Sequence, residues 1–81
     1  MSAAHRSTFS FTYSDPSEAR IIERAIRQEV DEIADDRSRT TVERSDDTVR
    51  VIVTATDLVA LRAACNTWLT LTTVAERAAT L

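Results

Sequence analysis

The side chains that most often carry out chemistry in proteins are scarce in this sequence. It holds one histidine, His5, and one cysteine, Cys65. His5 lies in a short start, residues 1–5, that we expect to be disordered. Cys65 stands on an apolar stretch between Ala64 and Asn66 with no positive partner in register, which is typical of a buried structural thiol. A single cysteine also excludes an internal disulfide framework and fits a reducing compartment.

Acidic residues and glycines give no sign of a catalytic or metal centre either. The pairs Asp35–Asp36 and Asp46–Asp47 fall in predicted turns, where aspartate is common, and no spacing of His, Cys and Asp resembles a metal site. The chain has no glycine, which excludes a P-loop, a dinucleotide-binding fingerprint and a nucleophile elbow. We therefore expect no enzymatic activity, no catalytic residues, no cofactor and no metal.

Arginine is the one residue type that could bind a ligand in numbers. All ten basic residues are arginines, against 13 acids, and the net charge is −3. Arginine binds phosphate bidentately, so a local patch could contact nucleic acid. A solvated face with neighbouring acidic partners is the simpler interpretation. The candidates surround a predicted hairpin or flank Asn66 on the last predicted helix: Arg37, Arg39, Arg44, Arg50, Arg62 and Arg77.

The absence of lysine has two explanations, and the sequence leaves both open. A salt-rich cytoplasm, as in a halophilic organism, disfavours the strongly hydrated lysine ammonium on the surface. A GC-rich coding bias also favours arginine over lysine.

Length and composition predict a single soluble domain over residues 1–81. The chain is 43% hydrophobic and 28% charged, as in globular proteins. A chain this short buries only about 60–65% of its unfolded surface, so its own core is marginal. The apolar runs are too short to span a bilayer and there is no N-terminal signal, so we expect a cytoplasmic protein without a membrane contact.

The first half of the sequence predicts a strand followed by a helix. Residues 6–13 place aromatic side chains at every second position, which indicates a half-buried strand. Asp15 is a suitable N-cap, Pro16 suits the first helical position, and Glu18 completes a capping box. The helix should end near Asp35–Asp36. Its core stripe comprises Ala19, Ile22, Ile26, Val30 and Ile33.

The second half predicts a hairpin and a second helix. The β-branched segments 38–44 and 48–55 flank an aspartate-rich turn at 45–47. Thr56 or Asp57 then caps a helix that runs to about Ala78. The order β-α-β-β-α predicts an α+β fold. Its three-stranded antiparallel sheet has the third strand in the centre and two helices packed on one face.

The second predicted helix carries two apolar stripes, although one is enough to seat a helix on a sheet. The stripe expected to meet the sheet comprises Leu58, Leu61, Cys65, Leu69 and Thr72, with Trp68 at its border. The other stripe comprises Ala60, Ala64, Thr67, Leu71, Val74 and Ala78. We expect part of this second stripe to face Ile21 and Ala25 of the first helix. The rest is predicted to dock a helix of another protein.

The predicted sheet also favours self-association. A three-stranded sheet exposes strand edges, and a domain this small gains stability from a partner. Ile52 and Val42 are expected to make its outer face partly apolar. We therefore predict a twofold homodimer that pairs strand edges or sheet faces.

Two segments of the chain resemble a known family. In "FSFTYSDPSEARIIERAIRQE", residues 9–29, a strand runs into a Pro-Ser-Glu-Ala helix start. In "VRVIVTATDLVALRAACNTWL", residues 49–69, a strand ends in Ala-Thr-Asp and enters a Leu-Arg-Ala-X-X-Asn helix. Together they cover about half the chain. In this order they resemble the small dimerisation subunit of the archaeal and eukaryotic KEOPS complex, also called the polarised-growth chromatin-associated controller family.

The resemblance implies a β-α-β-β-α fold and a non-catalytic role. The family's subunit dimerises and holds the threonylcarbamoyl-transferase subunit through a bundle of helices from both proteins. The complex makes N6-threonylcarbamoyladenosine in tRNA, which this subunit would meet only through the complex. Arg62 and Asn66 match the family's Arg and Asn positions, which implies a contact with the partner or with tRNA. We favour the partner, because an acidic subunit is a poor primary surface for tRNA.

Three other protein classes agree less well with the sequence. An RNA-binding module of the KH type needs a Gly-X-X-Gly loop, which a chain without glycine lacks. A ligand-sensing regulatory domain of β-α-β-β-α-β type needs a final strand, whereas these residues end in a predicted helix. A small enzyme is the least consistent of the three, since no catalytic constellation is present.

Overall fold

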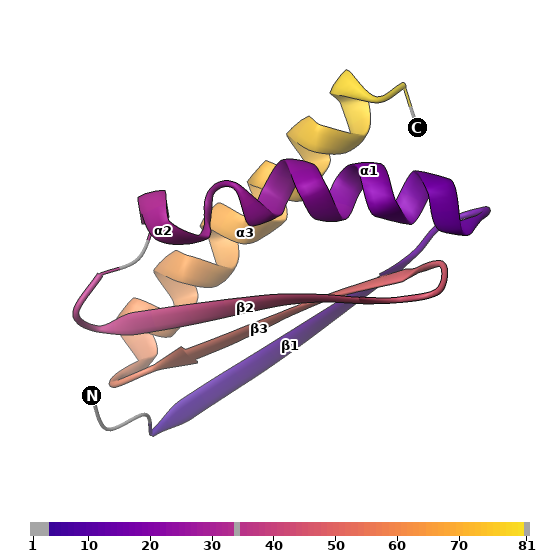
Figure 1. Ribbon diagram of the computed structural model, residues 1–81. Helices are drawn as coiled ribbons and strands as arrows, with labels where there is room; N and C mark the ends of the chain where they lie inside the picture. The colour runs from indigo at the N-terminus through magenta and orange to yellow at the C-terminus, as the bar shows by residue number, and fades with distance from the viewer. Residues whose placement is uncertain (1–3, 34, 81) are drawn as a thin grey trace.

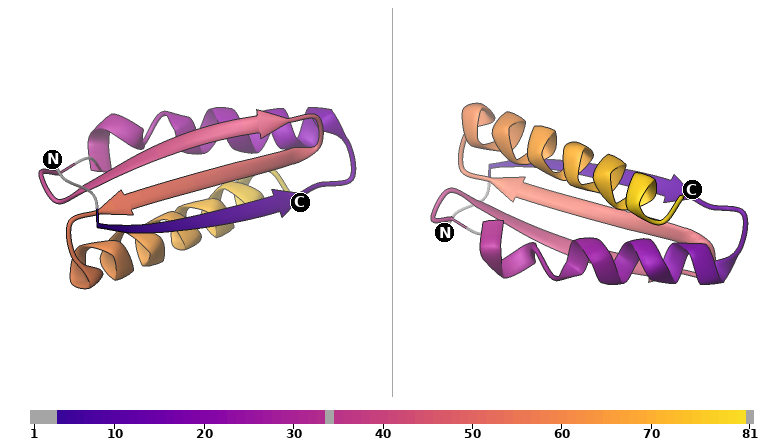
Figure 2. Two further views of the ribbon diagram at one scale, coloured as in Figure 1. Left: turned by 90° about the horizontal axis from the view of Figure 1, so that it is seen from below. Right: turned by 90° about the horizontal axis from the view of Figure 1, so that it is seen from above.

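The computed structural model describes residues 4–33 and 35–80 as one sheet with helices on one face. Strand β1, His5–Thr12, precedes helix α1, Pro16–Arg27, and the short helix α2, Val30–Ile33. Strands β2, Ser38–Ser45, and β3, Thr48–Ala55, form a hairpin, and helix α3, Leu58–Ala78, follows. The sheet order is β1-β3-β2 with both pairings antiparallel, and α1 and α3 lie on the same side (Figures 1 and 2). The predicted fold class and strand order are confirmed.

Alternation along the strands divides the sheet into a core face and an open face. On the central strand β3, Val49, Val51, Val53 and Ala55 are fully buried beneath the helices. Val42 of β2 pairs with Val51 and is also buried. The prediction that Val42 contributes to an apolar outer face is therefore wrong, because in-register antiparallel partners share a face. Ile52 does lie on the open face, where it is half-buried.

The N-terminal part of α1 forms as predicted, and its C-terminal part does not. The Asp15 carboxylate accepts hydrogen bonds from the Ser17 and Glu18 amides at 2.9 and 3.0 Å. The predicted continuous helix to Asp35–Asp36 is wrong, because α1 ends at Arg27. Its last turn tightens, since the Glu29 amide bonds to Ile26 only three residues back. The short α2 that follows turns Val30 and Ile33 onto the core.

The first strand begins earlier in the chain than predicted. His5 opens β1 and pairs with Ala55, which corrects the expectation of disorder for that residue. Residues 1–3 of the predicted disordered start lie outside the described residues. At the hairpin, Asp46 takes a positive φ of 58°, a conformation that aspartate tolerates in place of glycine.

Candidate docking face on helix α3

The rotation of α3 about its axis decides which residues remain available to a partner. Its buried residues follow one row at intervals of four: Ala60, Ala64, Trp68 and Thr72. Among the described residues, Trp68 is the largest fully buried side chain. The bulky indole fixes the core direction, and the alanines one and two turns before it let the start of the helix approach the sheet closely.

This rotation corrects the predicted assignment of the two stripes. Ala60 and Ala64, predicted to bind a partner, are only 7% and 6% exposed. Leu58 and Leu69, predicted to meet the sheet, are 58% and 39% exposed. The boundary between core and surface therefore lies about a sixth of a turn from its predicted position. A second apolar surface on α3 exists, but it is built from other residues than the predicted stripe.

The remaining predicted partner residues fall in two places. Ala25 of α1 and Leu71 and Val74 of α3 line the same groove between the two helices. Leu71 is partly buried there, which agrees with the expectation that part of the stripe faces the first helix. Thr67 and Ile21 are exposed to solvent. The exposure of Ile21 differs from the expectation that it faces the second stripe of α3, and it leaves Ile21 accessible to a partner.

We call the solvent-facing side of α3 the outer face. It includes Val59 and Val74, which are 70% and 54% exposed. Its only charged residues are Arg62 and Arg77. Such a long exposed surface with so little charge is unusual for a helix that meets only water. Its members are Leu58, Val59, Arg62, Ala63, Asn66, Thr67, Leu69, Thr70, Thr73, Val74 and Arg77.

Two threonines make this outer face less polar than the sequence indicates. The Thr67 hydroxyl donates to the Ala63 carbonyl and the Thr73 hydroxyl to the Leu69 carbonyl, both at 3.0 Å. A hydroxyl that is bonded back to its own helix offers little to a polar partner. The exposed surface is therefore closer to an apolar ridge than to a solvated helix face.

Length and composition alone would allow α3 to cross a membrane, contrary to the expectation from the apolar runs. Only 22% of its most apolar window is buried. A core helix of a water-soluble domain can have the same length and composition, and here Ala64 and Trp68 pack on the sheet core. α3 therefore exposes apolar surface beyond what the sheet requires.

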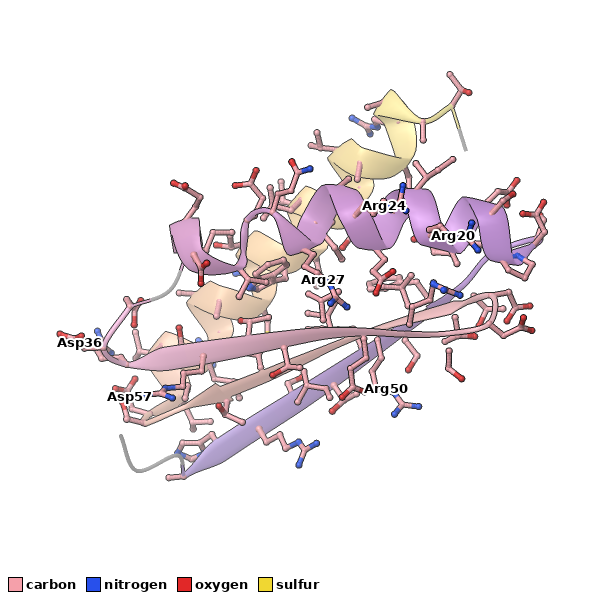
Figure 3. The ribbon with its side chains drawn as sticks, in the orientation of Figure 1. Arg20, Arg24, Arg27, Asp36, Arg50 and Asp57 are labelled. Atoms are coloured by element: carbon pink, nitrogen blue, oxygen red, sulfur yellow. The ribbon has the colours of Figure 1, made fainter. Side chains whose placement is uncertain are left out.

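Polar contacts hold α3 at both ends. At its start, the Asp57 carboxylate caps the Ala60 amide at 2.8 Å and binds the Arg37 guanidinium at 2.9 Å. Figure 3 labels Asp57. The hydrogen bond from the Ala60 amide and the ion pair with Arg37 lower the pKa of Asp57. Because Arg37 directly precedes β2, this carboxylate joins the helix to the sheet.

Near the other end, the Tyr13 hydroxyl donates to the Glu76 carboxylate at 2.7 Å. Burial, aided by Glu76, raises the pKa of Tyr13 well above its usual value, so the phenol remains a neutral donor. With both ends fixed, the outer face is presented as a preorganised surface.

Arg62 and Asn66 lie one turn apart within the outer face, and both are exposed. Across residues 4–33 and 35–80, the hydrogen bonds and ion pairs of the structure do not involve either side chain. Neither residue is thus used to stabilise the chain itself. The structure gives them the accessibility that a partner contact requires.

The other candidate residues take structural positions. Cys65 is partly buried against the core cluster, and Asp35 caps a turn by accepting from the Arg37 and Ser38 amides at 2.6 and 3.0 Å. Within the described residues, no group of three or more His, Cys, Asp or Glu side chains is placed to hold a metal ion.

The arginines around the hairpin do not form one patch. Arg37 pairs with Asp57, and Arg44 reaches Glu23 at 3.4 Å on the helix side of the sheet. Arg39 and Arg50 lie on the open face. The predicted cluster is therefore divided between two sides of the molecule.

Comparisons with known proteins agree with this architecture. A family model described as "Transcription factor Pcc1" matches residues 6–80. Among solved structures, one chain from the "Crystal structure of binary complex Gon7-Pcc1" superimposes with a TM-score of 0.87. The two chains are 14% identical, and the match covers 98% of this chain and 96% of that one, which shows a shared fold. A search of the curated proteins found no match.

Because the family model spans almost all of the sequence, the chain belongs to the Pcc1 family, the family of small KEOPS subunits that its two strand-to-helix segments indicated.

Proposed function

We propose that this chain is a non-catalytic dimerisation and docking subunit of a cytoplasmic KEOPS complex. In this role it holds the threonylcarbamoyl-transferase subunit through its helices and so supports N6-threonylcarbamoyladenosine formation in tRNA. The observation that carries the proposal is the outer face of α3, where Val59 and Val74 stand exposed beside threonines whose hydroxyls are already bonded. A helix from a partner would bury this ridge.

Arg62 and Asn66 fit the same proposal. They lie inside the ridge and not at its margin, so a helix that covers Val59 and Val74 also covers them. A partner carboxylate or carbonyl that meets the Arg62 guanidinium would supply a charge-assisted hydrogen bond and fix the register. The similar solved chain comes from a binary complex of Gon7 and Pcc1, which supports a role in binding a partner protein.

Co-purification with the transferase subunit tests the docking role. We expect Thr67→Glu and Val74→Glu to abolish the complex, because each places a charge on the apolar ridge. Both positions are exposed, so the isolated chain should keep its circular dichroism spectrum. Thr41→Glu, which adds the same side chain on the open face of the sheet, is the matched control and should co-purify normally.

The opposite pattern would contradict the proposal. If the two α3 variants co-purify as well as the unaltered chain, the outer face does not bind the transferase. Ala64→Arg is unsuitable for this test, because Ala64 is buried and its replacement would disrupt the core.

A further inference from the structure

The two outer strands of the sheet, β1 and β2, each turn a row of backbone groups away from the central strand. In an antiparallel pair, alternate residues bond to the neighbouring strand and those between them point outward. Such a row of amides and carbonyls is a template for a strand of another molecule. On β2, the residues whose backbone groups point outward are Ser38, Thr40, Val42 and Arg44.

The helices beside β2 do not close this edge by covering it. A groove of about 300 Å³ runs along the strand. Its walls are formed by Arg27, Val30 and Asp31 on the helix side and by residues 40–42 of β2 on the other. The middle of β2 is therefore accessible, and only polar contacts can prevent a second strand from pairing with it.

The Arg27 side chain supplies that contact from within the groove. Its Nη2 donates to the Val42 carbonyl at 2.7 Å and to the Glu23 carboxylate at 2.6 Å. The Glu23 side chain is only 17% exposed and also reaches Arg44 at 3.4 Å, so it holds the Arg27 guanidinium in place. Near the start of the strand, the Asp35 carboxylate accepts from the outward Ser38 amide at 3.0 Å.

The edge of β1 differs in its polar contacts and not in its length, since both strands have eight residues. Its outward residues are Arg6, Thr8, Ser10 and Thr12. Across residues 4–33 and 35–80, the hydrogen bonds of the structure do not occupy their outward amides and carbonyls. The sheet thus has one edge that is open to a strand and one whose outward groups are partly occupied.

We propose that Arg27, held by Glu23, blocks strand addition at β2 and so prevents open-ended assembly of this chain. A strand that added there would need the Val42 carbonyl, and it would have to break a charge-assisted hydrogen bond. The occupant that Arg27 excludes is β2 of a second copy, which could pair antiparallel about a twofold axis. Copies joined at β1 would otherwise continue to join at β2, since the two contacts together never close.

This role goes beyond the proposed docking function and uses another part of the molecule. Docking involves the outer face of α3, whereas Arg27 and Glu23 lie on α1 and contact β2. Val74→Glu therefore tests one proposal and Arg27→Ala the other. The comparison between variants also holds whether the unaltered chain is a monomer or a dimer.

Sedimentation velocity of the full chain over a range of micromolar concentrations tests the block. We expect the weight-average mass of Arg27→Ala to rise with concentration, to at least about twice that of the unaltered chain, because the freed edge adds a repeating contact. Arg27→Met, which keeps the length of the side chain without a donor, should behave in the same way.

The matched control is Arg24→Ala, which removes another exposed arginine of α1 and the same charge. Within the described part of the chain, the hydrogen bonds and ion pairs do not involve the Arg24 side chain, so this variant should sediment like the unaltered chain. Thr40→Pro removes an outward amide of β2. Added to Arg27→Ala, it should restore the mass of the unaltered chain.

Three results would overturn the proposal. They are an unchanged mass of a folded Arg27→Ala or Arg27→Met variant, equal growth of Arg24→Ala, and growth that persists when Thr40→Pro is added. The last would assign the growth to a surface other than β2. Circular dichroism of each variant establishes that it is folded.

Discussion

At the scale of single residues, the Asp57 carboxylate connects two elements through one group. It caps α3 at the Ala60 amide and accepts hydrogen bonds from Nη2 and Nε of Arg37, at 2.9 and 3.2 Å. We expect Asp57→Asn to retain the cap and lose the ion pair, and Asp57→Ala to lose both. The urea midpoint should therefore be highest for the unaltered chain, lower for Asp57→Asn and lowest for Asp57→Ala. Equal midpoints for all three would show that the contact does not stabilise the fold.

The lowered pKa of the same residue predicts how the stability of the fold changes in acid. Hydrogen bonds from Ala60 and Arg37 lower the folded-state pKa of Asp57, and bonds from Ser17 and Glu18 lower that of Asp15. A lowered folded pKa means that the stabilisation is complete above the unfolded value, near 3.9. It is lost as pH falls through that value toward the folded pKa. Between pH 6 and pH 3, the urea midpoint of Asp57→Asn should fall less than that of the unaltered chain.

Trp68 makes a different kind of contribution, through volume and not polarity. Its indole is buried, and within the described residues its Nε1 has no hydrogen-bond partner. We expect Trp68→Ala to cost about 3–5 kcal/mol in free energy of unfolding. Trp68→Phe should cost much less, because it keeps a ring in place and removes an unpaired donor whose burial costs about 1–3 kcal/mol. A large cost for Trp68→Phe in urea titrations would indicate that the N–H is satisfied in solution.

At the scale of elements, the two edges of the sheet differ in how they meet a partner. On β2, the Arg27 guanidinium donates to the outward Val42 carbonyl at 2.7 Å, and Figure 3 shows Arg27 between α1 and that strand. The Tyr13 amide bonds to the Asp47 carbonyl, which turns the even-numbered backbone groups of β1 outward. We infer that a homodimer pairs its β1 edges, since on β2 the Arg27 guanidinium already occupies an outward carbonyl that a second strand would need.

Proline substitution tests this inference without breaking a bond inside the sheet. Ser10→Pro removes an outward amide of β1 and should shift the chain toward monomer. Thr40→Pro removes an outward amide of β2 and should leave the dimer intact. Sedimentation at micromolar concentration in high salt measures the oligomeric state of both variants. A dimer that survives Ser10→Pro and dissociates in Thr40→Pro would assign the interface to β2, and a monomeric unaltered chain would contradict self-association.

Local signals predicted the elements themselves well. Aromatic alternation and β-branched runs predicted the three strands, and the caps at Asp15 and at Thr56 or Asp57 predicted where both long helices begin. These features depend on residues within a few positions of one another. The order of strands then follows from short connections and antiparallel pairing.

Tertiary packing decided what the sequence could not predict. The end of α1 depends on the tight turn before Val30, which brings that residue and Ile33 onto the core. The rotation of α3 depends on where the Trp68 indole finds room among buried valines. Helical periodicity assigns apolar residues to stripes but does not weight them by volume. Periodicity alone therefore predicts Ala60 and Ala64 at the surface, and Leu58 and Leu69 in the core.

At the scale of the whole molecule, the net charge is divided unevenly between the open face of the sheet and the rest of the chain. Apart from the open sheet face, the chain carries a net charge of −5, which follows from its total of −3 and the +2 that three arginines and one glutamate give to that face. At low ionic strength the acids in the rest of the chain repel one another over more than about 10 Å, while at 1 M salt the screening length is about 3 Å. A small domain has little hydrophobic stabilisation to offset such repulsion.

The folded state should therefore gain stability as salt rises. We expect the melting temperature of the unaltered chain to increase between low and molar KCl. Asp31 and Glu32 of α2 are exposed, so Asp31→Asn with Glu32→Gln relieves repulsion without altering the core. This double variant should melt higher than the unaltered chain at low salt and rise less steeply with KCl, because screening then has less repulsion to remove. If the unaltered chain melts at the same temperature throughout, salt adaptation is not the reason for its lysine-free composition, and the coding bias explains it instead.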